Sequence, residues 1–447
     1  MTFVALVAAA AMTAAQTKAV DALVKSTLAS EHIAGATVGV AVDGRFEYRK
    51  AFGFADVAAH TRATVDTVYP IGSVTKQFTA ACVLLLAQEH KLAIDDPLSR
   101  YVTGLPWADR VTLRHMLDQE SGIADFRLGV ADTSTALARA DVVERLAQTD
   151  LQFAPGSKYE YSNSNYYLLG TVVEKVAGEP YDRFLAERIL DPLGMHSTYY
   201  DSGSTPLAAL ARPYAASPQG PQPVAPENPD WSFAAGALAT TVADLATWDD
   251  ALRAGRVIDA SSSHEMFSPG TLDDGSQTDY AFGWVSVRHD GRRLVWHNGE
   301  VTGYHAMNAM FPDERTDVIV LTNTGGTFAA DSLALRIFDA LHPFVATDAD
   351  RAAADRAKEW VGRIERGDVD RTQLTNQMSA VLTPSVVTAA GAQLRSFGSL
   401  KSVAPASIDE DASGRSYTFQ VAFAKRTIRW VMGIDTSGKI SALSLEL

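Results

Sequence analysis

Ser73 and Lys76 are the residues whose types and spacing most directly suggest chemistry. They lie in the stretch Tyr-Pro-Ile-Gly-Ser-Val-Thr-Lys-Gln-Phe-Thr-Ala, the only place where a lysine follows a serine by three positions. Three residues make nearly one helical turn, so a helix that begins at Ser73 puts the hydroxyl and the amine on one face. A lysine whose pKa is lowered by burial can take the proton of a serine nucleophile. Taken alone, this spacing can also arise by chance.

A second candidate group is Tyr161-Ser162-Asn163, the only Tyr-x-Asn in the chain. It follows a predicted turn at residues 153–156, which places it on a loop of a helical region. A tyrosine near a lysine ammonium can have a lowered pKa and carry protons between nucleophile and leaving group. In an extended loop Asn163 faces the same way and can hydrogen-bond a substrate amide. The alternative is that Tyr161 only packs with the neighbouring tyrosines.

Two His-x-Gly sequences could supply a third part of a site. Residues 289–291 read His-Asp-Gly between strand-like runs, which predicts a hairpin turn without chemistry. His297-Asn298-Gly299 follows an apolar run and lies on or at the end of a predicted strand. Gly299 would let a substrate backbone approach this strand closely. The backbone N–H groups of Ser73 and Glu300 could then form an oxyanion hole, which requires two converging donors.

The composition excludes several other kinds of site. The chain has 447 residues with a formal net charge of −14, which argues against nucleic acid and anionic membranes as partners. The single Cys82 excludes an intrachain disulfide and a cysteine-built metal site, and it is expected to be a buried thiol. His115, Asp118 and Glu120 match no familiar metal-site spacing and are interpreted as polar residues at a helix end.

The first fifteen residues form an apolar run that ends in small residues. This pattern resembles a secretory signal peptide with cleavage near Ala15, although the usual basic residue near the start is missing. The alternative is a helical or poorly ordered N-terminus of a cytoplasmic protein. The run is too short to span a bilayer. We therefore expect a signal peptide at residues 1–15 and a periplasmic or secreted protein without a transmembrane anchor.

The elements that must position these residues predict an α+β protein. Strands near both ends of a helical middle indicate one antiparallel sheet with a helical lobe inserted, and a substrate cleft between the two. Helical periodicity runs from residue 73 to about 200, and an amphipathic helix is expected at 17–30. Asp43-Gly44 is a strong hairpin signal. The strands are predicted at residues 35–42, 45–52, 280–289, 293–297, 304–312 and 316–323.

Two further segments stand apart from this pattern. Residues 202–229 are rich in Pro, Gly, Ala and Ser, and form either a loop at the rim of the cleft or a surface insertion. From residue 346 onward the pattern restarts as a small α+β domain. Its helices are predicted at 351–367 and 384–390, and its strands at 416–424, 427–434 and 440–447. The expected domains are therefore residues 16–345 and 346–447.

In order, Ser73-x-x-Lys76, Tyr161-x-Asn163 and His297-x-Gly299 resemble the three motifs of the serine β-lactamase and penicillin-binding-protein superfamily. The closest similarity is to the branch of class C β-lactamases, D-Ala-D-Ala carboxypeptidases, D-aminopeptidases and related esterases. The resemblance covers roughly residues 17–343. Similar flanking segments lie at residues 112–117, 121–123, 153–170, 192–195 and 235–241. The region from 346 onward is only loosely similar to cystatin-like and nuclear-transport-factor-like domains. Such a domain could bind a polymer, pack against the cleft or mediate dimers.

The resemblance implies a β-lactamase/transpeptidase-like fold and an acyl-enzyme mechanism. Ser73 would be the nucleophile, Lys76 with Tyr161 would handle protons, and Asn163 would orient the substrate. The resemblance implies neither a metal nor an organic cofactor. Many relatives have Lys-Thr-Gly as the third motif, where the lysine and threonine help bind a substrate carboxylate. Here the motif begins with His297, which is mostly uncharged near neutral pH. Carboxylate binding should therefore be weaker, which favours peptides, amides or esters over efficient β-lactam hydrolysis.

Two classes of function follow from these observations. The first is a serine hydrolase acting on peptide, amide or ester substrates such as cell-wall fragments, as a D-amino-acid peptidase, carboxypeptidase or esterase. A β-lactamase of modest activity is the alternative within this class. The second class is a non-catalytic cell-wall-binding protein on the same fold. The sequence favours the hydrolase because every motif residue is present, whereas a retired enzyme usually loses its nucleophile or lysine.

Overall fold

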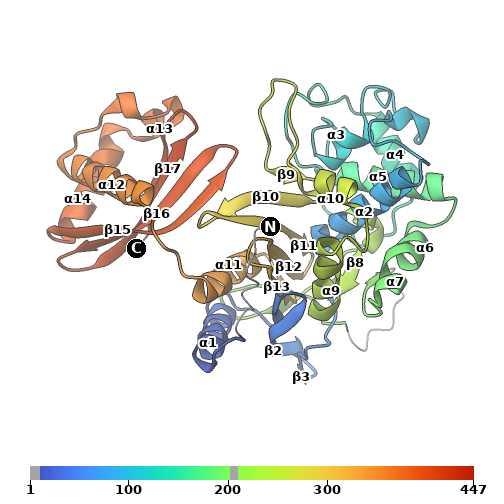
Figure 1. Ribbon diagram of the computed structural model, residues 1–447, viewed down its shortest axis with the longest axis horizontal. Helices are drawn as coiled ribbons and strands as arrows, with labels where there is room; N and C mark the ends of the chain where they lie inside the picture. The colour runs from blue at the N-terminus through green and yellow to red at the C-terminus, as the bar shows by residue number, and fades with distance from the viewer. Residues whose placement is uncertain (1–10, 202–209, 447) are drawn as a thin grey trace, which may run out of the picture. The chain divides into compact units, whose positions relative to one another are not determined.

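A computed structural model describes residues 11–201 and 210–446, which form two compact units (Figure 1). The first unit takes its described residues from 1–286 and 294–341, and the second from 287–293 and 342–446. Residues 1–10 of the predicted signal peptide lie outside the described residues. The domain ranges expected from the sequence stay predictions.

An antiparallel sheet in the first unit joins segments from both ends of its chain. Its strands are β1 (Gly35–Val42), β2 (Arg45–Asp56), β3 (Thr61–Arg62), β9 (Tyr280–Ala281), β10 (Trp284–His289), β11 (Arg292–Val301), β12 (Tyr304–Phe311) and β13 (Thr316–Thr322), of which residues 287–289 of β10 and 292–293 of β11 belong to the second unit. β1 pairs with β2 on one side and with β13 on the other, so that Val38 lies opposite Val320. β12 follows β13, and β11 follows β12. The prediction of one sheet built from distant segments is confirmed.

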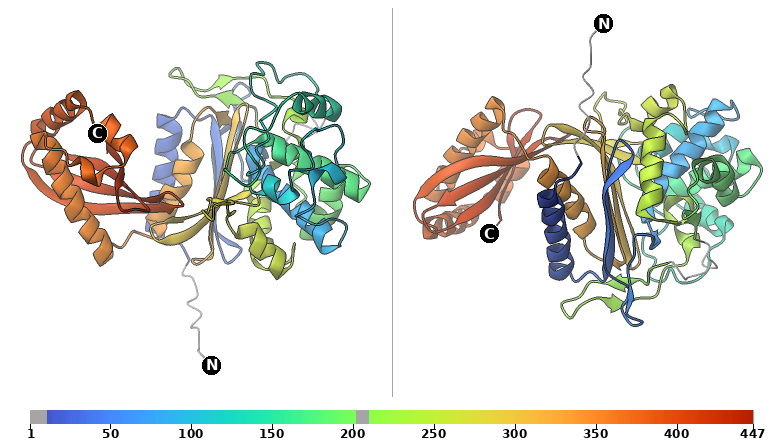
Figure 2. Two further views of the ribbon diagram at one scale, coloured as in Figure 1. Left: turned by 90° about the horizontal axis from the view of Figure 1, so that it is seen from above. Right: turned by 60° about the horizontal axis from the view of Figure 1, so that its bottom comes forward.

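Helices cover both faces of this sheet (Figure 2). α1 (Ala14–Ser30) and α11 (Ala329–Leu341) pack together, with α11 against β12 and β13, while α9 (Val242–Arg253) packs against β1 and β13. Because both faces are covered, β12 and β13 are buried along their full lengths. The hairpin predicted at residues 43–44 is confirmed, with φ of +52° and +71° at its two turn residues.

A helical lobe is inserted between β3 and β9, as predicted. Its helices are α2 (Thr75–Gln88), α3 (Leu113–Leu117), α4 (Arg139–Ala147), α5 (Asn163–Ala177), α6 (Tyr181–Leu185), α7 (Asp191–Leu193), α8 (Phe233–Gly236) and α10 (Ala260–Phe267). Single-turn segments are η1 (Gly72–Val74), η2 (Leu98–Arg100), η3 (Ala186–Leu190) and η4 (Pro229–Trp231). α2 is buried along most of its length and is therefore a central helix of the lobe, in which Cys82 is fully buried as expected.

Two small sheets complete the first unit. One joins β4 (Tyr69–Pro70), β8 (Leu238–Thr240) and β5 (Tyr199–Tyr200), and it holds the chain just before Ser73. The other joins β14 (Thr324–Gly325), β6 (Tyr214–Ala215) and β7 (Gln222–Pro223). β6 and β7 belong to the irregular segment predicted at 202–229, of which residues 202–209 lie outside the described part of the chain.

The second unit packs helices against an antiparallel meander. Its helices are α12 (Asp348–Arg366), α13 (Asn376–Val381) and α14 (Pro384–Ser396), and a single turn, η5 (Arg371–Gln373), precedes α13. Its strands are β15 (Leu400–Asp411), β16 (Gly414–Phe423), β17 (Thr427–Asp435) and β18 (Ile440–Glu446), paired in that order. Three of these strands were predicted, whereas β15 was missed. β15 lacks an apolar alternation because most of its side chains are half-buried or exposed.

None of the helices in the described part of the chain combines the length and apolar character that a bilayer crossing requires.

Candidate active site

Ser73 lies on the η1 turn that leads directly into α2. Gly72 has a φ of +51°, and a Cβ there would come within 2.6 Å of the backbone nitrogen of Glu300, so only glycine fits. A Cβ on Gly299 would lie 1.9 Å from the carbonyl oxygen of Ile71. The edge of β11 therefore runs directly against the turn that carries Ser73. The backbone that Gly299 admits is the chain's own, rather than the substrate backbone expected from the sequence.

Lys76 is fully buried on the first turn of α2, and its Nζ contacts three oxygen atoms. Nζ lies 2.9 Å from Ser73 Oγ, 2.9 Å from Asn163 Oδ1 and 2.8 Å from the carbonyl oxygen of Ala235. The predicted serine–lysine contact is therefore present. The other two partners come from α5 and α8, so three separate segments of the helical lobe fix the position of this amine.

Burial lowers the pKa of Lys76 well below its usual range; the charge of Asp125 opposes this shift, and that of Arg127 adds to it. A neutral amine has two hydrogens and one lone pair. The two carbonyl-type partners can only accept, so they take both hydrogens. The lone pair is then directed at Ser73 Oγ and can accept the hydroxyl proton. The geometry thus suits Lys76 as a general base.

Tyr161 lies on the loop just before α5, and its hydroxyl donates to Ser73 Oγ at 2.8 Å. Its ring also lies 4.9 Å from Lys76 Nζ and packs edge-on against Tyr280. The predicted lowering of its pKa is wrong, because burial raises the pKa of the Tyr161 phenol. The phenol therefore keeps its proton at neutral pH, and it can pass that proton on only when it receives another.

Asn163 is the first residue of α5, and its side chain is held at both ends. Oδ1 accepts from Lys76 Nζ, while Nδ2 donates to Asp125 Oδ2 at 2.9 Å. The backbone nitrogen of Asn163 donates to the same carboxylate oxygen at 3.0 Å. The sequence predicts a substrate-binding amide here. One Nδ2 hydrogen remains for that role after the bond to Asp125.

His297 lies within β11 and is buried beside Tyr161 and Tyr280. Its Nδ1 contacts the carbonyl oxygen of Asn298, which can only accept, so Nδ1 carries a hydrogen. Nε2 then accepts from the Tyr280 hydroxyl at 3.1 Å. Burial, together with nearby Lys76, lowers the pKa of His297 to about 3. The third motif therefore carries no positive charge, as the sequence predicts.

Acidic side chains lie on the other side of the third motif. Asn298 Nδ2 donates to Asp331 Oδ2 at 2.9 Å, and Nε2 of His305 lies 3.3 Å from Asp331 Oδ1. Burial lowers the pKa of His305, but the hydrogen bond and charge of Asp331 outweigh burial and raise it overall. Glu300 is exposed, and its Oε1 accepts from the backbone nitrogen of Gly326 at 2.8 Å.

Ser73, Tyr161 and the third motif open onto a cavity of about 340 Å³. It is lined by Ser73, Tyr159, Tyr161, Tyr280, Val285, Trp296, His297, Asn298, Gly299, Glu300 and His305. A second cavity of about 430 Å³ is lined by Val301 and Thr302 on one side and by Gly236 and Ala237 on another. Residues 223–229, in the described part of the predicted excursion, contribute to its wall. Substrate-sized space therefore lies at both ends of residues 297–302.

The seven site residues predicted from the sequence meet at one place, but several of their partners were missed. Asp125, Ala235 and Tyr280 each contact one of the predicted residues, and Asp331 contacts Asn298 within the third motif. The segment containing Ala235 was noted in the family resemblance, but Lys76 contacts its carbonyl oxygen, for which side-chain type gives no signal. Asp125 was not singled out at all.

Comparison with known proteins agrees with this geometry. Residues 20–342 match the protein family described as Beta-lactamase. Penicillin-binding protein 4* of Bacillus subtilis (strain 168) is 29% identical over 315 residues, which cover 66% of this chain and 70% of that protein. Protein flp of Staphylococcus aureus (strain MW2) is longer than this chain, and the match covers 63% of its length.

Solved structures show the same fold. D-amino acid amidase from Ochrobactrum anthropi SV3, complexed with L-phenylalanine amide, has a TM-score of 0.67 and 25% identity. That match covers 73% of this chain and 99% of the amidase. The octameric penicillin-binding protein homologue from Pyrococcus abyssi has a TM-score of 0.64 and 21% identity, and covers 96% of this chain and 99% of the homologue. Because the family match spans more than half of the chain, the protein belongs to the Beta-lactamase family and is a serine hydrolase.

Proposed function

We propose that this protein hydrolyses amides, peptides or esters through an acyl-enzyme on Ser73. The observation that carries this proposal is the set of contacts to Lys76, which leaves the lone pair of a neutral amine directed at Ser73 Oγ. Lys76 takes the hydroxyl proton as Oγ bonds to the substrate carbonyl carbon. Tyr161, bonded to the same oxygen, relays a proton to the departing amine or alcohol.

The negative charge on the carbonyl oxygen requires two donors in this mechanism. We assign this role to the backbone N–H groups of Ser73 and Glu300, which lie on the two segments that Gly72 and Gly299 allow to approach closely. Water then attacks the ester on Ser73, and the same base accepts its proton. Asn163 orients the substrate, and His297 shapes the neighbouring wall as a neutral group. No metal or organic cofactor takes part in these steps.

We propose further that the substrate lacks a carboxylate next to the bond that is cleaved. Glu300 lines the catalytic cavity, and Asp331 accepts a hydrogen bond from Asn298, so two acidic groups lie next to the third motif, which begins with lysine in many relatives. His305 contacts only one of these acidic groups, Asp331. An amide of a D-amino acid or peptide, or an ester, fits better than a free C-terminal carboxylate. The likeness to a D-amino acid amidase supports this choice.

A matched pair of substrates tests the proposal. We expect N-acetyl-D-Ala-D-Ala amide to be cleaved at least ~10-fold faster, by kcat/KM, than N-acetyl-D-Ala-D-Ala, because one repulsive charge changes binding by roughly 1.4 kcal/mol. p-Nitrophenyl acetate serves as an ester reference, and the Ser73→Ala variant as the blank. Equal rates for the two peptides would overturn the substrate assignment. No Ser73-dependent hydrolysis of any of the three would overturn the mechanism.

We also propose that residues 16–345 form the hydrolase domain of an exported protein and residues 346–447 an accessory domain. The small-residue leader supports export, and the separate hydrophobic core around Trp360 and Phe419 supports the division. Sequencing the mature N-terminus and expressing residues 16–345 alone test these two points. A mature protein that retains residue 1, or a fragment that does not fold, would contradict them.

A further inference from the structure

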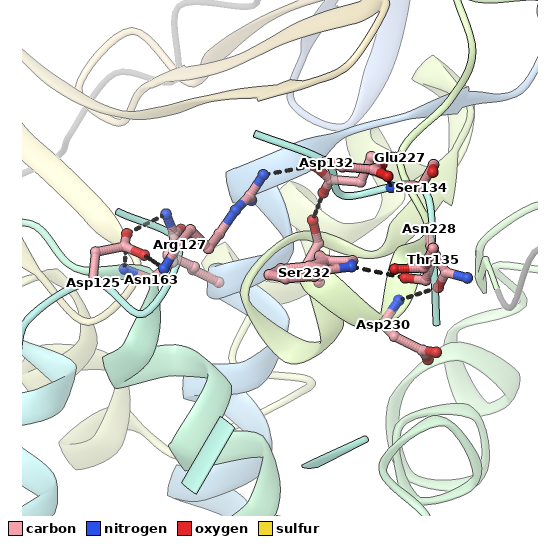
Figure 3. Close-up of polar contacts among 12 residues, drawn as sticks. Asp125, Arg127, Asp132, Ser134, Thr135, Asn163, Glu227, Asn228, Asp230 and Ser232 are labelled. Carbon is pink, nitrogen blue, oxygen red and sulfur yellow. Dashed lines mark hydrogen bonds and ion pairs between the residues drawn. The ribbon is translucent and has the colours of Figure 1, made fainter. Parts of the chain in front are cut away.

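A ring of hydrogen bonds starts at Lys76 and returns to it, and the residues that close this ring were absent from the sequence-based site. One side leads from Lys76 through Asn163 to Asp125, and the other leads to the carbonyl oxygen of Ala235. Figure 3 shows the part between Asn163 and Ser232. Asp125 lies on the loop after α3, while Ser232 lies immediately before α8.

The middle of the ring is an ion pair between two loops. Arg127 Nη2 lies 2.6 Å from Glu227 Oε2, and the Glu227 side chain is only 4% exposed. The backbone nitrogen of Arg127 donates to Asp125 Oδ1 at 2.9 Å. Ser232 Oγ donates to the other oxygen of Glu227. Because this pair is largely shielded from water, it holds its geometry more firmly than an exposed pair would.

The ring closes through α8. The backbone nitrogen of Ala235 donates to the carbonyl oxygen of Ser232 at 2.8 Å, and the carbonyl of Ala235 in turn accepts from Lys76. Both oxygens that take the hydrogens of Lys76 are therefore fixed by residues of the ring. We use the term ring for these seven residues: Lys76, Asn163, Asp125, Arg127, Glu227, Ser232 and Ala235.

Asp125 decides which end of the Asn163 amide faces Lys76. A carboxylate can only accept, so it selects the Nδ2 end and leaves Oδ1 facing Nζ. In the reversed orientation, Nδ2 would face Nζ and compete for its lone pair. The backbone bond from Asn163 to the same oxygen fixes the carboxylate as well. The orientation of one amide thus keeps the lone pair of Lys76 available to Ser73.

We propose that Asp125 is a positioning residue that orients Asn163 and, together with Arg127, sets the balance of charge around Lys76. This inference rests on the proposed role of Lys76 as the base for Ser73. The two residues act in opposite directions, since a nearby anion favours a protonated amine and a nearby cation favours a neutral one. The other groups that face Lys76 are Tyr161 and Tyr166, whose rings lie 4.9 and 5.8 Å from Nζ, and the neutral His297.

The pH dependence of Ser73 labelling tests this inference. The second-order rate constant of fluorophosphonate labelling rises with pH as the base loses its proton, and this rising part of the pH profile is its acid limb. We expect Asp125→Asn, which keeps an acceptor oxygen but loses the charge, to move this acid limb down by roughly 0.5–1 pH unit. We expect Arg127→Gln to move it up by about the same amount. Each rate is measured on the full-length protein, with folding checked by its thermal melting.

The directions of the two shifts decide the outcome. A merely structural role would lower the rate at every pH and leave the limb in place. Unmoved limbs, or limbs that move in the same direction, would overturn the inference; if only one variant folds, the direction of its own shift decides. Asp125→Ala, which also releases Asn163, should reduce the plateau rate by at least ~10-fold relative to Asp125→Asn. A wild-type protein that is not labelled at Ser73 would overturn the proposed function itself.

Discussion

Two parts of the site differ in how they treat charge: the nucleophile end around Ser73 and Lys76, and the acidic end around Glu300 and Asp331. At the nucleophile end Lys76 is fully buried, and burial favours the neutral forms of Lys76 and Tyr161 by lowering the pKa of the amine and raising that of the phenol. At the acidic end Glu300 is exposed and Asp331 is half-buried, and of these two acidic groups only Asp331 pairs with a histidine, His305. A short length of β11 separates these environments.

This difference suggests that the nucleophile end carries out the reaction and that the acidic end selects the substrate. A neutral amine and a neutral phenol can exchange protons with Ser73 because water does not stabilise their charged forms. Acidic groups near solvent are poor proton carriers for this reaction, but they repel a substrate carboxylate. We therefore expect changes at the nucleophile end to abolish turnover of every substrate. Changes at the acidic end should alter which substrates are accepted.

The largest effect is expected from removing the base. Lys76→Met keeps a long buried side chain but removes the amine, so kcat/KM for p-nitrophenyl acetate should fall by more than ~10³-fold, as should that of Ser73→Ala. Lys91→Met, at a lysine that is half-exposed and pairs with Glu89, is the matched control and should change little. A Lys76→Met protein that kept a tenth of its activity would contradict the assignment.

The second effect concerns the proton relay. Tyr161→Phe removes the hydroxyl that donates to Ser73 and should lower kcat about 10²-fold. Because burial raises the pKa of Tyr161, wild-type activity should not rise through ionisation of this phenol below about pH 10. Tyr159→Phe is the control, since Tyr159 lines the same cavity. Similar losses in both variants would show that ring packing, rather than the Tyr161 hydroxyl, is responsible.

The third effect tests the acidic end. The double variant Glu300→Gln and Asp331→Asn should raise kcat/KM for N-acetyl-D-Ala-D-Ala about 10-fold relative to its amide, as roughly 1.4 kcal/mol of repulsion is removed. The backbone donor of residue 300 is unaffected. Asp348→Asn, on α12 in the second unit, is the control for a general loss of negative charge. An unchanged ratio would mean that these carboxylates do not select the substrate.

The smallest effect is on stability and concerns burial of a carboxylate outside the cavity. Burial, with the charge of Asp273 adding to it, raises the pKa of Glu120 to about 7. The folded protein therefore binds this proton more tightly than the unfolded chain does, and stability is lost as pH rises from about 4.5, the ordinary pKa of a glutamate, to about 7. Glu120→Gln should raise the melting temperature near pH 8 relative to wild type. Equal melting temperatures of Glu120→Gln and wild type near pH 8 would contradict the raised pKa of Glu120.

The sequence predicted the parts of the fold and site that depend on side-chain type and order. Ser73, Lys76, Tyr161 and Asn163 met as expected because each is recognisable from its motif. The Ala235 carbonyl could not be found in this way, since any residue supplies one. The direction of the Tyr161 pKa was wrong because burial depends on packing between distant segments. Strand β15 was missed for a related reason. Its own sequence shows no regular apolar alternation, and it is recognisable as a strand only from its pairing with β16.

The central claim is an acyl-enzyme on Ser73, and acid-quenched intact-mass measurement followed by peptide mapping tests it most directly. With p-nitrophenyl acetate, we predict one acetyl group on the peptide that contains Ser73, and none in Ser73→Ala. The adduct should decay as hydrolysis continues. A protein that hydrolyses the ester without acylation at Ser73, or that carries the acetyl group on another residue, would contradict the account.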